Sequence, residues 1–352
     1  AGADAFNTAM GYKAGEAVTT GVENTLVGAG SGDALTIGNY NTTLGAFALG
    51  LSVDGDYNTA IGYKALQDYE DGDGNGNNTA VGALSQLNAT TGEQNTSLGS
   101  LSMGIGVTTG DANVAIGASA GKRITSAAQN VFIGNSAGAN ITTAAGTVAV
   151  GYDALTTEDD HGTTTAVGYQ SLTLQNAGAS SYNTALGYQT GLALTTGVEN
   201  TLIGGKAGDA LTTGSQNIAI GTDALDAEDT GSRNIAIGYN SLKALNYDGN
   251  GYNVAIGFNA GKALTGINNT LIGSIAGDAL VAGDNNTVLG YNAMGAANGS
   301  ESRNVAIGSN ALSAMDNDAS NYNTAVGYDA GAAVTTGIAN TIIGALAGDA
   351  MQ

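Results

Sequence analysis

The stretch Asn7-Thr8-Ala9-Met10-Gly11 is the first of twenty copies of one five-residue pattern, and the last copy is Asn340-Thr341-Ile342-Ile343-Gly344. Twelve of the nineteen intervals between successive copies are 17 residues long, and all lie between 16 and 20. The copies begin at residues 7, 24, 41, 58, 78, 95, 113, 130, 147, 164, 183, 200, 217, 234, 253, 269, 286, 304, 323 and 340. A repeat this short is too small for a helical unit and too regular for linked domains. It predicts an all-β fold, a parallel β-solenoid in which each copy begins one coil.

Position 1 of each coil is its first residue, which is Asn in eighteen copies and Thr in two, Thr147 and Thr164. Stacked coils would place one amide above another, and Asn ladders of this kind hydrogen-bond between layers. The expected ladder includes Asn7, Asn24, Asn58, Asn200 and Asn253.

Positions 2 to 4 have the pattern of a β-strand. Position 2 is β-branched in every copy, and position 4 is a large aliphatic residue from Met10 to Ile343. Side chains alternate along a strand, so positions 2 and 4 share one face and position 3 lies on the other. Position 3 is also mostly apolar, as in Ala9 and Phe132, which predicts a strand buried on both faces. We expect flat coils with two short strands and a thin core, and lateral association in a parallel bundle of three would cover position 3.

Position 5 is Gly in all twenty copies, and a small residue such as Ala14 or Ser31 always follows three residues later. A recurring Gly indicates that no Cβ fits, because φ is positive or because backbone packs on backbone. We therefore expect position 5 to form a corner of the coil. The expected glycine ladder includes Gly11, Gly28, Gly62, Gly204 and Gly257.

Position 9 alternates between pairs of Gly, such as Gly15 and Gly32, and pairs of larger residues, such as Leu49 and Leu66. From residue 113 onward, the starts at 113, 183, 253 and 323 give a four-coil super-repeat of 70 residues. The array therefore grew by duplication of a multi-coil unit. We hypothesise that the Gly and Leu coils present different widths to whatever packs beside them.

The 352 residues are expected to form one elongated domain, 1–352, because the repeat leaves no boundary. With ~4.8 Å per layer, the coils would make a rod on the order of 95 Å long. The chain is acidic, with 9 Lys and Arg against 30 Asp and Glu and a net charge of −21, which argues against a nucleic-acid partner. No apolar run approaches the ~20 residues that a membrane helix needs. The absence of Cys leaves no disulfide framework.

Solenoids normally end in polar caps that stop edge-to-edge growth, and the sequence offers none. The first residue is Ala1 rather than Met, which indicates processing or trimming. Joining Asn340 of one copy to Asn7 of the next gives an interval of 19 residues, inside the observed range. We expect that copies can stack head-to-tail into a filament, and the alternative is that flanking segments lie outside this sequence.

The longest insertion, residues 68–77, lies where a coil returns to the next Asn, and counterparts at 245–252 and 315–322 would project from the same edge. Asp71, Asp73 and Asn75 have the Asp-x-Asp-x-Asn-Gly spacing that wraps oxygens round a hard cation, so calcium is the expected metal. The comparison with an EF-hand then fails, because Gly82 stands where the bidentate Glu belongs. The alternative is a solvated turn rich in Gly, Asn and Asp.

No catalytic constellation emerges from the sequence. The single histidine, His161, lies in the acidic turn Glu158-Asp159-Asp160-His161, where we expect it to be solvated. The glycines follow the coil period without a Lys-Ser or Lys-Thr pair behind them, so they do not form a phosphate-binding loop. We expect no enzymatic activity and no cofactor apart from calcium.

Tyr recurs just after position 5 and just before position 1, for example at Tyr152, Tyr169 and Tyr252. Rows of Tyr can grip sugars, so a surface glycan is a candidate partner, but on strands they more often pack against each other with a wet hydroxyl. Thr pairs such as Thr19-Thr20 and Thr195-Thr196 raise an ice-binding alternative, although many coils lack them.

The unit Asn-Thr-Ala-Ile-Gly followed by a small residue, as in residues 58–65 and 253–260, resembles the repeats of trimeric autotransporter adhesin heads. It is also similar to repeats of bacteriophage tail-fibre and related cell-surface fibre proteins. The resemblance runs from Asn7 to Ala350 and implies a left-handed parallel β-roll that forms a homotrimer. This chain departs from the adhesin heads in its longer coil and in having no recognisable neck or coiled-coil stalk.

These features indicate a non-enzymatic structural protein of an extracellular fibre or filament, on a cell-surface appendage or a virion. Its expected partner is itself, as a lateral homotrimer or a head-to-tail filament. The alternative is a glycan- or receptor-binding adhesin or tail-fibre module, with an ice-binding protein less favoured.

Overall fold

A computed structural model describes residues 4–70 and 75–350 of the protein. The chain divides into two compact units, Ala1–Ser181 and Tyr182–Gln352, so the single domain expected over 1–352 stays a prediction. The described residues contain strands and turns but no helix, and hence no helix that could cross a membrane.

The described part of each unit contains ten strands, and each strand is three residues long. Those of the first unit are β1 (Thr8–Met10), β2 (Thr25–Val27), β3 (Thr42–Leu44), β4 (Thr59–Ile61), β5 (Thr79–Val81), β6 (Thr96–Leu98), β7 (Val114–Ile116), β8 (Val131–Ile133), β9 (Val148–Val150) and β10 (Thr165–Val167). Those of the second unit are β11 (Thr184–Leu186), β12 (Thr201–Ile203), β13 (Ile218–Ile220), β14 (Ile235–Ile237), β15 (Val254–Ile256), β16 (Thr270–Ile272), β17 (Thr287–Leu289), β18 (Val305–Ile307), β19 (Thr324–Val326) and β20 (Thr341–Ile343).

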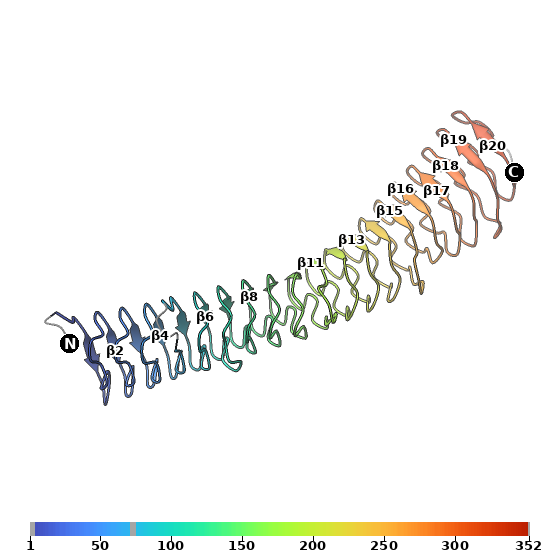
Figure 1. The fold of residues 1–352 in the computed structure, drawn as a ribbon. Coiled ribbons are helices and arrows are strands. Elements are labelled where there is room, and N and C mark those ends of the chain that lie inside the picture. Colours follow the sequence, from blue (N-terminus) through green and yellow to red (C-terminus); the bar gives the residue numbers. More distant parts are fainter. Residues whose placement is uncertain (1–3, 71–74, 351–352) are drawn as a thin grey trace. The chain divides into compact units, whose positions relative to one another are not determined.

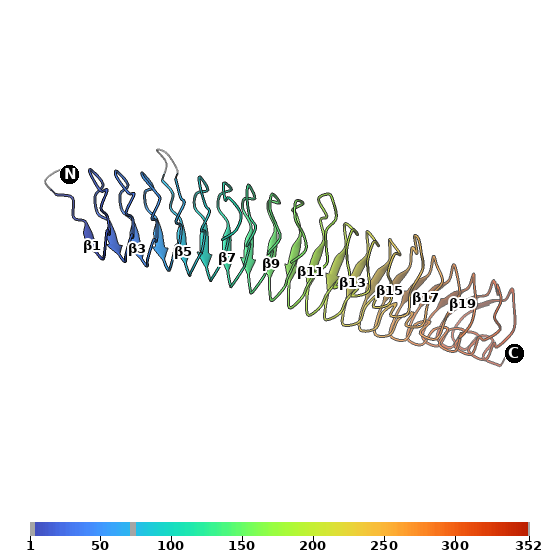
Figure 2. The same ribbon diagram turned by 90° about the horizontal axis from the view of Figure 1, so that it is seen from below.

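Within each unit, every strand pairs in parallel with the strand of the next coil. Thr201 of β12 lies opposite Ile218 of β13, which lies opposite Ile235 of β14, and the strand arrows stand side by side in both views (Figure 1, Figure 2). The parallel β-solenoid predicted from the period is therefore confirmed, whereas its left-handed sense stays a prediction. The expected second strand is not found in the described part of any coil, because turns with several positive-φ residues make up the rest of the coil.

The Gly at position 5 turns the chain directly after each strand. Its φ lies between 125° and 145° in all twenty copies, a region that side chains with a Cβ rarely adopt. A Cβ on Gly11 would lie 2.5 Å from the carbonyl oxygen of Gly28, and one on Gly257 would lie 2.3 Å from that of Gly273. The same close approach occurs at the other expected members, Gly28, Gly62 and Gly204. Both reasons for a recurring Gly, a positive φ and close packing of backbone on backbone, therefore hold at position 5, and the glycine ladder is confirmed.

The structure corrects which strand face lies inside. At position 3, Ala60, Phe132 and Leu202 are 0% exposed, whereas at position 4 Leu44 is 51% and Leu186 is 48% exposed. The expectation that lateral association would cover position 3 is therefore wrong, because the chain itself buries position 3 and leaves position 4 exposed. The interior is so narrow that Ala fills position 3 in most coils, and the larger side chains of position 4 lie outside.

Position 9 shares the interior with position 3, and a Leu or Phe side chain at position 3 lies against a Gly at position 9. Phe132 at position 3 lies against Gly138 at position 9 of its own coil, where a Cβ would be only 2.5 Å from Phe132 Cδ1. In another coil position 3 is Ala236, and Leu242 at position 9 is buried beside it. The alternation of Gly and Leu therefore adjusts the volume of the core. The hypothesis that Gly and Leu coils present different widths to a neighbouring molecule stays a prediction.

Candidate functional site

The Asn ladder joins the coils of each unit from inside. Asn200 Oδ1 accepts a hydrogen bond from the backbone N–H of Asn217 (2.9 Å), and Asn200 Nδ2 donates across its own coil to the carbonyl oxygen of Gly214 (2.9 Å). The bond to the next coil's backbone is also made by the other expected members, Asn7, Asn24, Asn58 and Asn253. The predicted ladder is confirmed. Its principal bond runs from backbone to side chain, and amide-to-amide bonds such as Asn41 Nδ2 to Asn24 Oδ1 (3.1 Å) supplement it.

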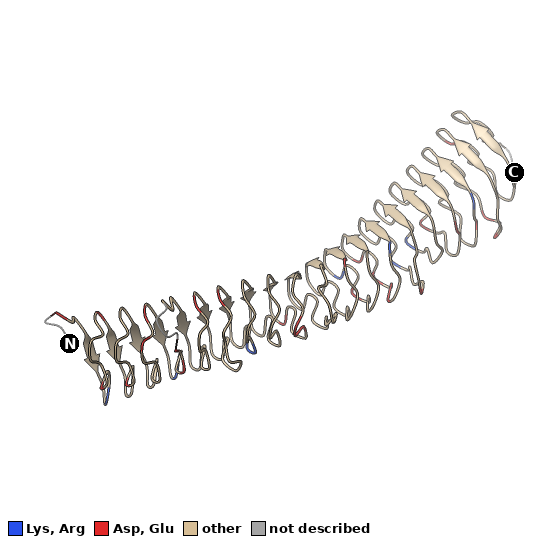
Figure 3. Ribbon diagram, in the orientation of Figure 1, with Lys and Arg blue, Asp and Glu red and all other residues tan. Residues whose placement is uncertain are grey.

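The outward side chains at positions 2 and 4 form what we call the strand face of each unit. None of the strand residues is charged, and Figure 3 shows Lys, Arg, Asp and Glu only on the connecting turns of the described chain. Because the strands pair in register, equivalent positions form columns along the face. The column at position 2 is Thr in every strand from β1 to β6. The strand face thus combines exposed aliphatic side chains at position 4 with Thr, Val or Ile at position 2 and carries no charge, and exposed aliphatic columns of this kind are typical of an interaction surface.

Aromatic side chains stack between neighbouring coils. The ring centroids of Tyr40 and Tyr57 are 4.8 Å apart and those of Tyr152 and Tyr169 are 5.4 Å apart, with the ring planes inclined by 12° in both pairs. Each ring therefore covers a face that a sugar would need. The stacks favour the interpretation that these tyrosines pack against each other.

The hydroxyl of the first Thr in several of the Thr pairs bonds to the next coil. Thr195 Oγ1 donates to the carbonyl oxygen of Thr212 (3.0 Å), and Thr212 Oγ1 donates to that of Asp229 (3.0 Å). Thr19 does the same with Thr36 (3.1 Å). An ice-binding surface needs hydroxyls that order water, so this arrangement does not favour that alternative.

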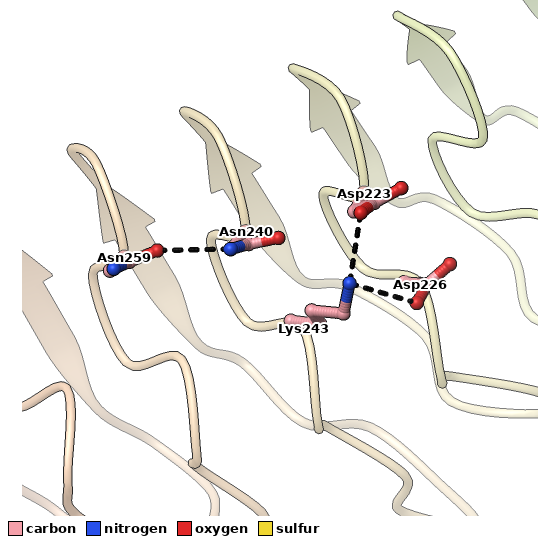
Figure 4. Close-up of polar contacts among 5 residues, drawn as sticks. All are labelled: Asp223, Asp226, Asn240, Lys243 and Asn259. Carbon is pink, nitrogen blue, oxygen red and sulfur yellow. Dashed lines mark hydrogen bonds and ion pairs between the residues drawn. The ribbon is translucent and has the colours of Figure 1, made fainter.

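Polar side chains on the turns also pair between coils. Lys243 Nζ lies 2.9 Å from Asp223 Oδ2 and 3.6 Å from Asp226 Oδ2, and Asn240 Nδ2 donates to Asn259 Oδ1 (3.1 Å), as Figure 4 shows. The hydrogen bond to Asp223 raises the pKa of Lys243 above its ordinary value. Because partly exposed ion pairs contribute little free energy, we assign this cluster a role in coil alignment only.

Buried glutamates brace the turns opposite the strands, a feature that the sequence did not reveal. Glu228, at position 12, is 0% exposed, and its Oε1 accepts a hydrogen bond from the backbone N–H of Gly231 (2.7 Å). Burial raises the pKa of Glu228 to about 7, although the bonds from backbone N–H groups act in the opposite direction. Glu301 accepts similar bonds from the backbone N–H groups of Gly299 (3.0 Å) and Asn317 (3.0 Å).

The coil that begins at Thr147 also has a buried glutamate, Glu158, but neither of its carboxylate oxygens has a hydrogen-bond partner. Burial raises the pKa of Glu158 to about 7. Nearby backbone N–H groups, that of His161 foremost, oppose this rise electrostatically without reaching hydrogen-bond geometry. Three ligand atoms, one from each of Glu158, Asp159 and His161, lie within 4.8 Å of one another. Among the described residues, this is the group of three that could hold a metal ion.

The expectation of a solvated His161 is wrong, because its side chain is half-buried and Nδ1 is buried without a partner. A signal was present in the sequence: this coil has Thr147 where most have Asn, and Glu158 where its neighbours along the chain have Ile141 and Gln175. These two departures, together with His161 itself, distinguish this coil from its neighbours.

The expected calcium site is not tested by the structure. Asp71 and Asp73 lie outside the described residues. Asn75 is exposed and forms an isolated parallel bridge with Asp56 of the preceding coil. The calcium site and the absence of enzymatic activity both stay predictions.

No protein-family model and no curated protein matches the sequence of this chain. The relation to adhesin heads and tail fibres is thus a resemblance of the repeats. The function has to be argued from the coils and their surfaces.

Proposed function

We propose that the chain is a structural part of an extracellular fibre and has no catalytic role. The observation that carries the proposal is the series of hydrogen bonds between coils, which passes through every strand pair of each unit and through the Asn ladder. Stacking of this kind gives stiffness along the coil axis and leaves few backbone groups open to proteases.

The strand face is the surface through which we propose that three copies associate side by side. It is uncharged and has exposed aliphatic side chains at position 4, while the charged residues on the turns would remain in water. The same face on each copy would be covered in a closed parallel trimer. The resemblance to trimeric adhesin heads and tail fibres supports both the trimer and a location on a cell surface or a virion.

The test places a charge on the strand face without changing the core. We expect Leu44→Lys combined with Leu98→Lys to convert the trimer to monomers, because both side chains are about half exposed and would meet another copy. Ile37→Lys is the matched control, since Ile37 is 47% exposed but lies on a turn. Sedimentation velocity measures the mass, and circular dichroism checks the fold.

A wild-type chain that remains monomeric at all concentrations would refute the lateral trimer. An unchanged mass in the Leu44 and Leu98 variant would show that another surface makes the contact. The head-to-tail filament stays a separate proposal, and electron microscopy of the concentrated wild-type protein tests it, because only head-to-tail stacking produces particles of increasing length.

Binding of surface glycans is a second candidate, favoured by exposed tyrosines that take part in no ring stack. Tyr291 is 58% and Tyr328 is 56% exposed. We expect Tyr291→Ala combined with Tyr328→Ala to abolish glycan binding in an array screen if these rings supply the platform. Equal binding by the variant and the wild-type protein would exclude these two tyrosines as the platform.

A further inference from the structure

The coil that begins at Thr147 differs from its neighbours at two facing positions. In the preceding coil, Asn130 Nδ2 donates across the interior to the carbonyl oxygen of Ala144 at position 15 (2.9 Å). Thr147 has no amide to donate, and position 15 of its coil is His161 in place of Gly or Ala. The polar groups inside this coil are therefore not paired in the usual way.

Within the described part of the chain, this coil has more buried side-chain polar atoms without a hydrogen-bond partner than any other coil. They are Thr147 Oγ1, both carboxylate oxygens of Glu158 and Nδ1 of His161. A buried carboxylate without a partner costs far more free energy than a neutral group in the same place. A cation bound at these atoms would remove this cost.

Glu228 provides a matched comparison, because it occupies the same position 12 four coils further along the sequence. In that coil Asn217 Nδ2 donates to the carbonyl oxygen of Gly231 (2.9 Å), and the N–H of Gly231 donates to Glu228 Oε1 (2.7 Å). The backbone thus satisfies Glu228. Glu158 lacks these bonds and has an imidazole and a second carboxylate beside it.

We propose that Glu158, Asp159 and His161 together bind a divalent transition-metal ion, for which Zn²⁺ is the best match. One imidazole nitrogen and two carboxylate oxygens are a donor set that zinc accepts, with water in the fourth position. Zinc ligands lie about 2.1 Å from the metal, so tetrahedral donors are about 3.5 Å apart. The three donors already lie within 4.8 Å of one another, and a small movement of the side chains closes the site.

The ion can reach this site from the surface. An open hollow is lined by Asp159 together with Asn140, Thr142 and Arg123. Asp160 also lines the hollow, where its carboxylate accepts a hydrogen bond from Thr142 Oγ1 and is held beside the site. The net charge of −21 concentrates cations near the whole chain, which any test must separate from binding at this coil.

The test uses the fact that His161 is the only histidine of the chain. A histidine-selective ¹H–¹³C NMR spectrum therefore contains one imidazole signal set, and Zn²⁺ should shift it with a stoichiometry of about one. Calorimetry should give the same stoichiometry. Mg²⁺ at equal concentration should leave the imidazole signals in place, because it prefers oxygen ligands.

Variants locate the ion. We expect Glu158→Gln and, separately, His161→Asn to weaken Zn²⁺ binding at least about tenfold, since loss of an outer-shell partner alone costs 10- to 100-fold. Glu228→Gln should leave the affinity unchanged. Glu158→Gln is compatible with the fold, because Gln175 occupies the same position in the next coil, and thermal denaturation in the absence of metal checks this.

Imidazole signals that do not move in excess Zn²⁺ would overturn the proposal, and this result needs no variant. An equal affinity in the wild-type, Glu158→Gln and His161→Asn proteins would overturn it as well. That outcome would assign the bound zinc to scattered surface carboxylates.

Discussion

Exchange of a Gly coil for a Leu coil is the perturbation that tests most directly how the interior is built. Phe132 lies between Gly121 of the preceding coil and Gly138 of its own, where Cβ atoms would be 2.8 Å and 2.5 Å from its ring. Phe132→Ala alone leaves a cavity and should cost about 3–5 kcal/mol. Gly138→Leu alone pushes a side chain into the ring and should cost about 1–3 kcal/mol, with about 1 kcal/mol more for the positive φ.

The double variant recreates a combination that the chain already uses. Ala236 at position 3 and Leu242 at position 9 occur together, and Leu242 has a φ of 49°, near that of Gly138 at 57°. The φ of Leu242 shows that Leu is tolerated in this conformation. We therefore expect Phe132→Ala with Gly138→Leu to cost only about 1–3 kcal/mol, which gives a coupling energy of about 5 kcal/mol between the two changes.

Hydrogen exchange measured by mass spectrometry is the appropriate assay, because a repeat array opens locally and need not unfold in two states. The free energy of opening is read from the amides of β8 and of the strands on either side. Ile133→Ala is the control, since Ile133 lies in the same strand but points outward and is 37% exposed, and we expect it to cost less than about 1.5 kcal/mol. Additive effects of the two core changes, or an Ile133→Ala cost as large as that of Phe132→Ala, would refute this account of the interior.

Three further variants test the ladder, the corner and the buried glutamates. Asn217→Ala removes the donor to Gly231 and the acceptor for the next coil's backbone N–H. Hydrogen exchange should therefore show that the free energy of local opening falls by about 2–5 kcal/mol. A decrease of less than about 1 kcal/mol would contradict the role of the Asn ladder. Gly221→Ala puts a Cβ 2.5 Å from the carbonyl oxygen of Gly238 and should lower the free energy of local opening by at least about 2 kcal/mol. An unchanged free energy of opening would contradict the role of position 5 as a corner that only Gly fits. The pKa of Glu228 is raised from 4.5 to about 7 by burial, so between these pH values the folded protein keeps a proton that the unfolded chain loses, and stability falls by about 1.4 kcal/mol per pH unit as pH rises. Glu228→Gln should remove this part of the pH dependence of stability, as measured by thermal denaturation at pH 5 and 7.5. If stability changes equally with pH in the variant and the wild-type protein, the result would count against a buried, protonated carboxyl at Glu228.

The period, the corner and the ladder could be predicted from the sequence because each depends on one residue type with one physical property. Only Gly fits where a Cβ would meet the carbonyl of the next coil, and only an amide both accepts from the next coil and donates across its own. Recurrence at a fixed spacing within one chain is therefore enough to locate these positions.

The inner face of the strand could not be predicted in the same way, because both faces are apolar. The larger side chains at position 4 suggested the core by hydrophobicity, but burial is decided by the width of the interior, which Ala fits better than Ile. The backbone conformation of the residue before position 1 could not be predicted from the sequence either. Tyr57 and Arg233 have φ values of 58° and 63°, in a region that such side chains seldom adopt, and only the stacked coils hold them there.

The placement of polar groups in the interior follows from the same limit on volume. Where position 9 is Gly, position 12 carries a large aliphatic side chain, as Ile141 does beside Gly138. Where position 9 is Leu, much of the interior is already filled with apolar atoms, and position 12 can instead hold Glu158 or Glu228. Leu coils are thus the places where the solenoid can bury a carboxylate, although Leu245 takes the same position in the Leu coil of Leu242. A metal site is compatible with this fold in the Leu coils, where Glu158 lies, and the strand face remains available for contacts with other chains.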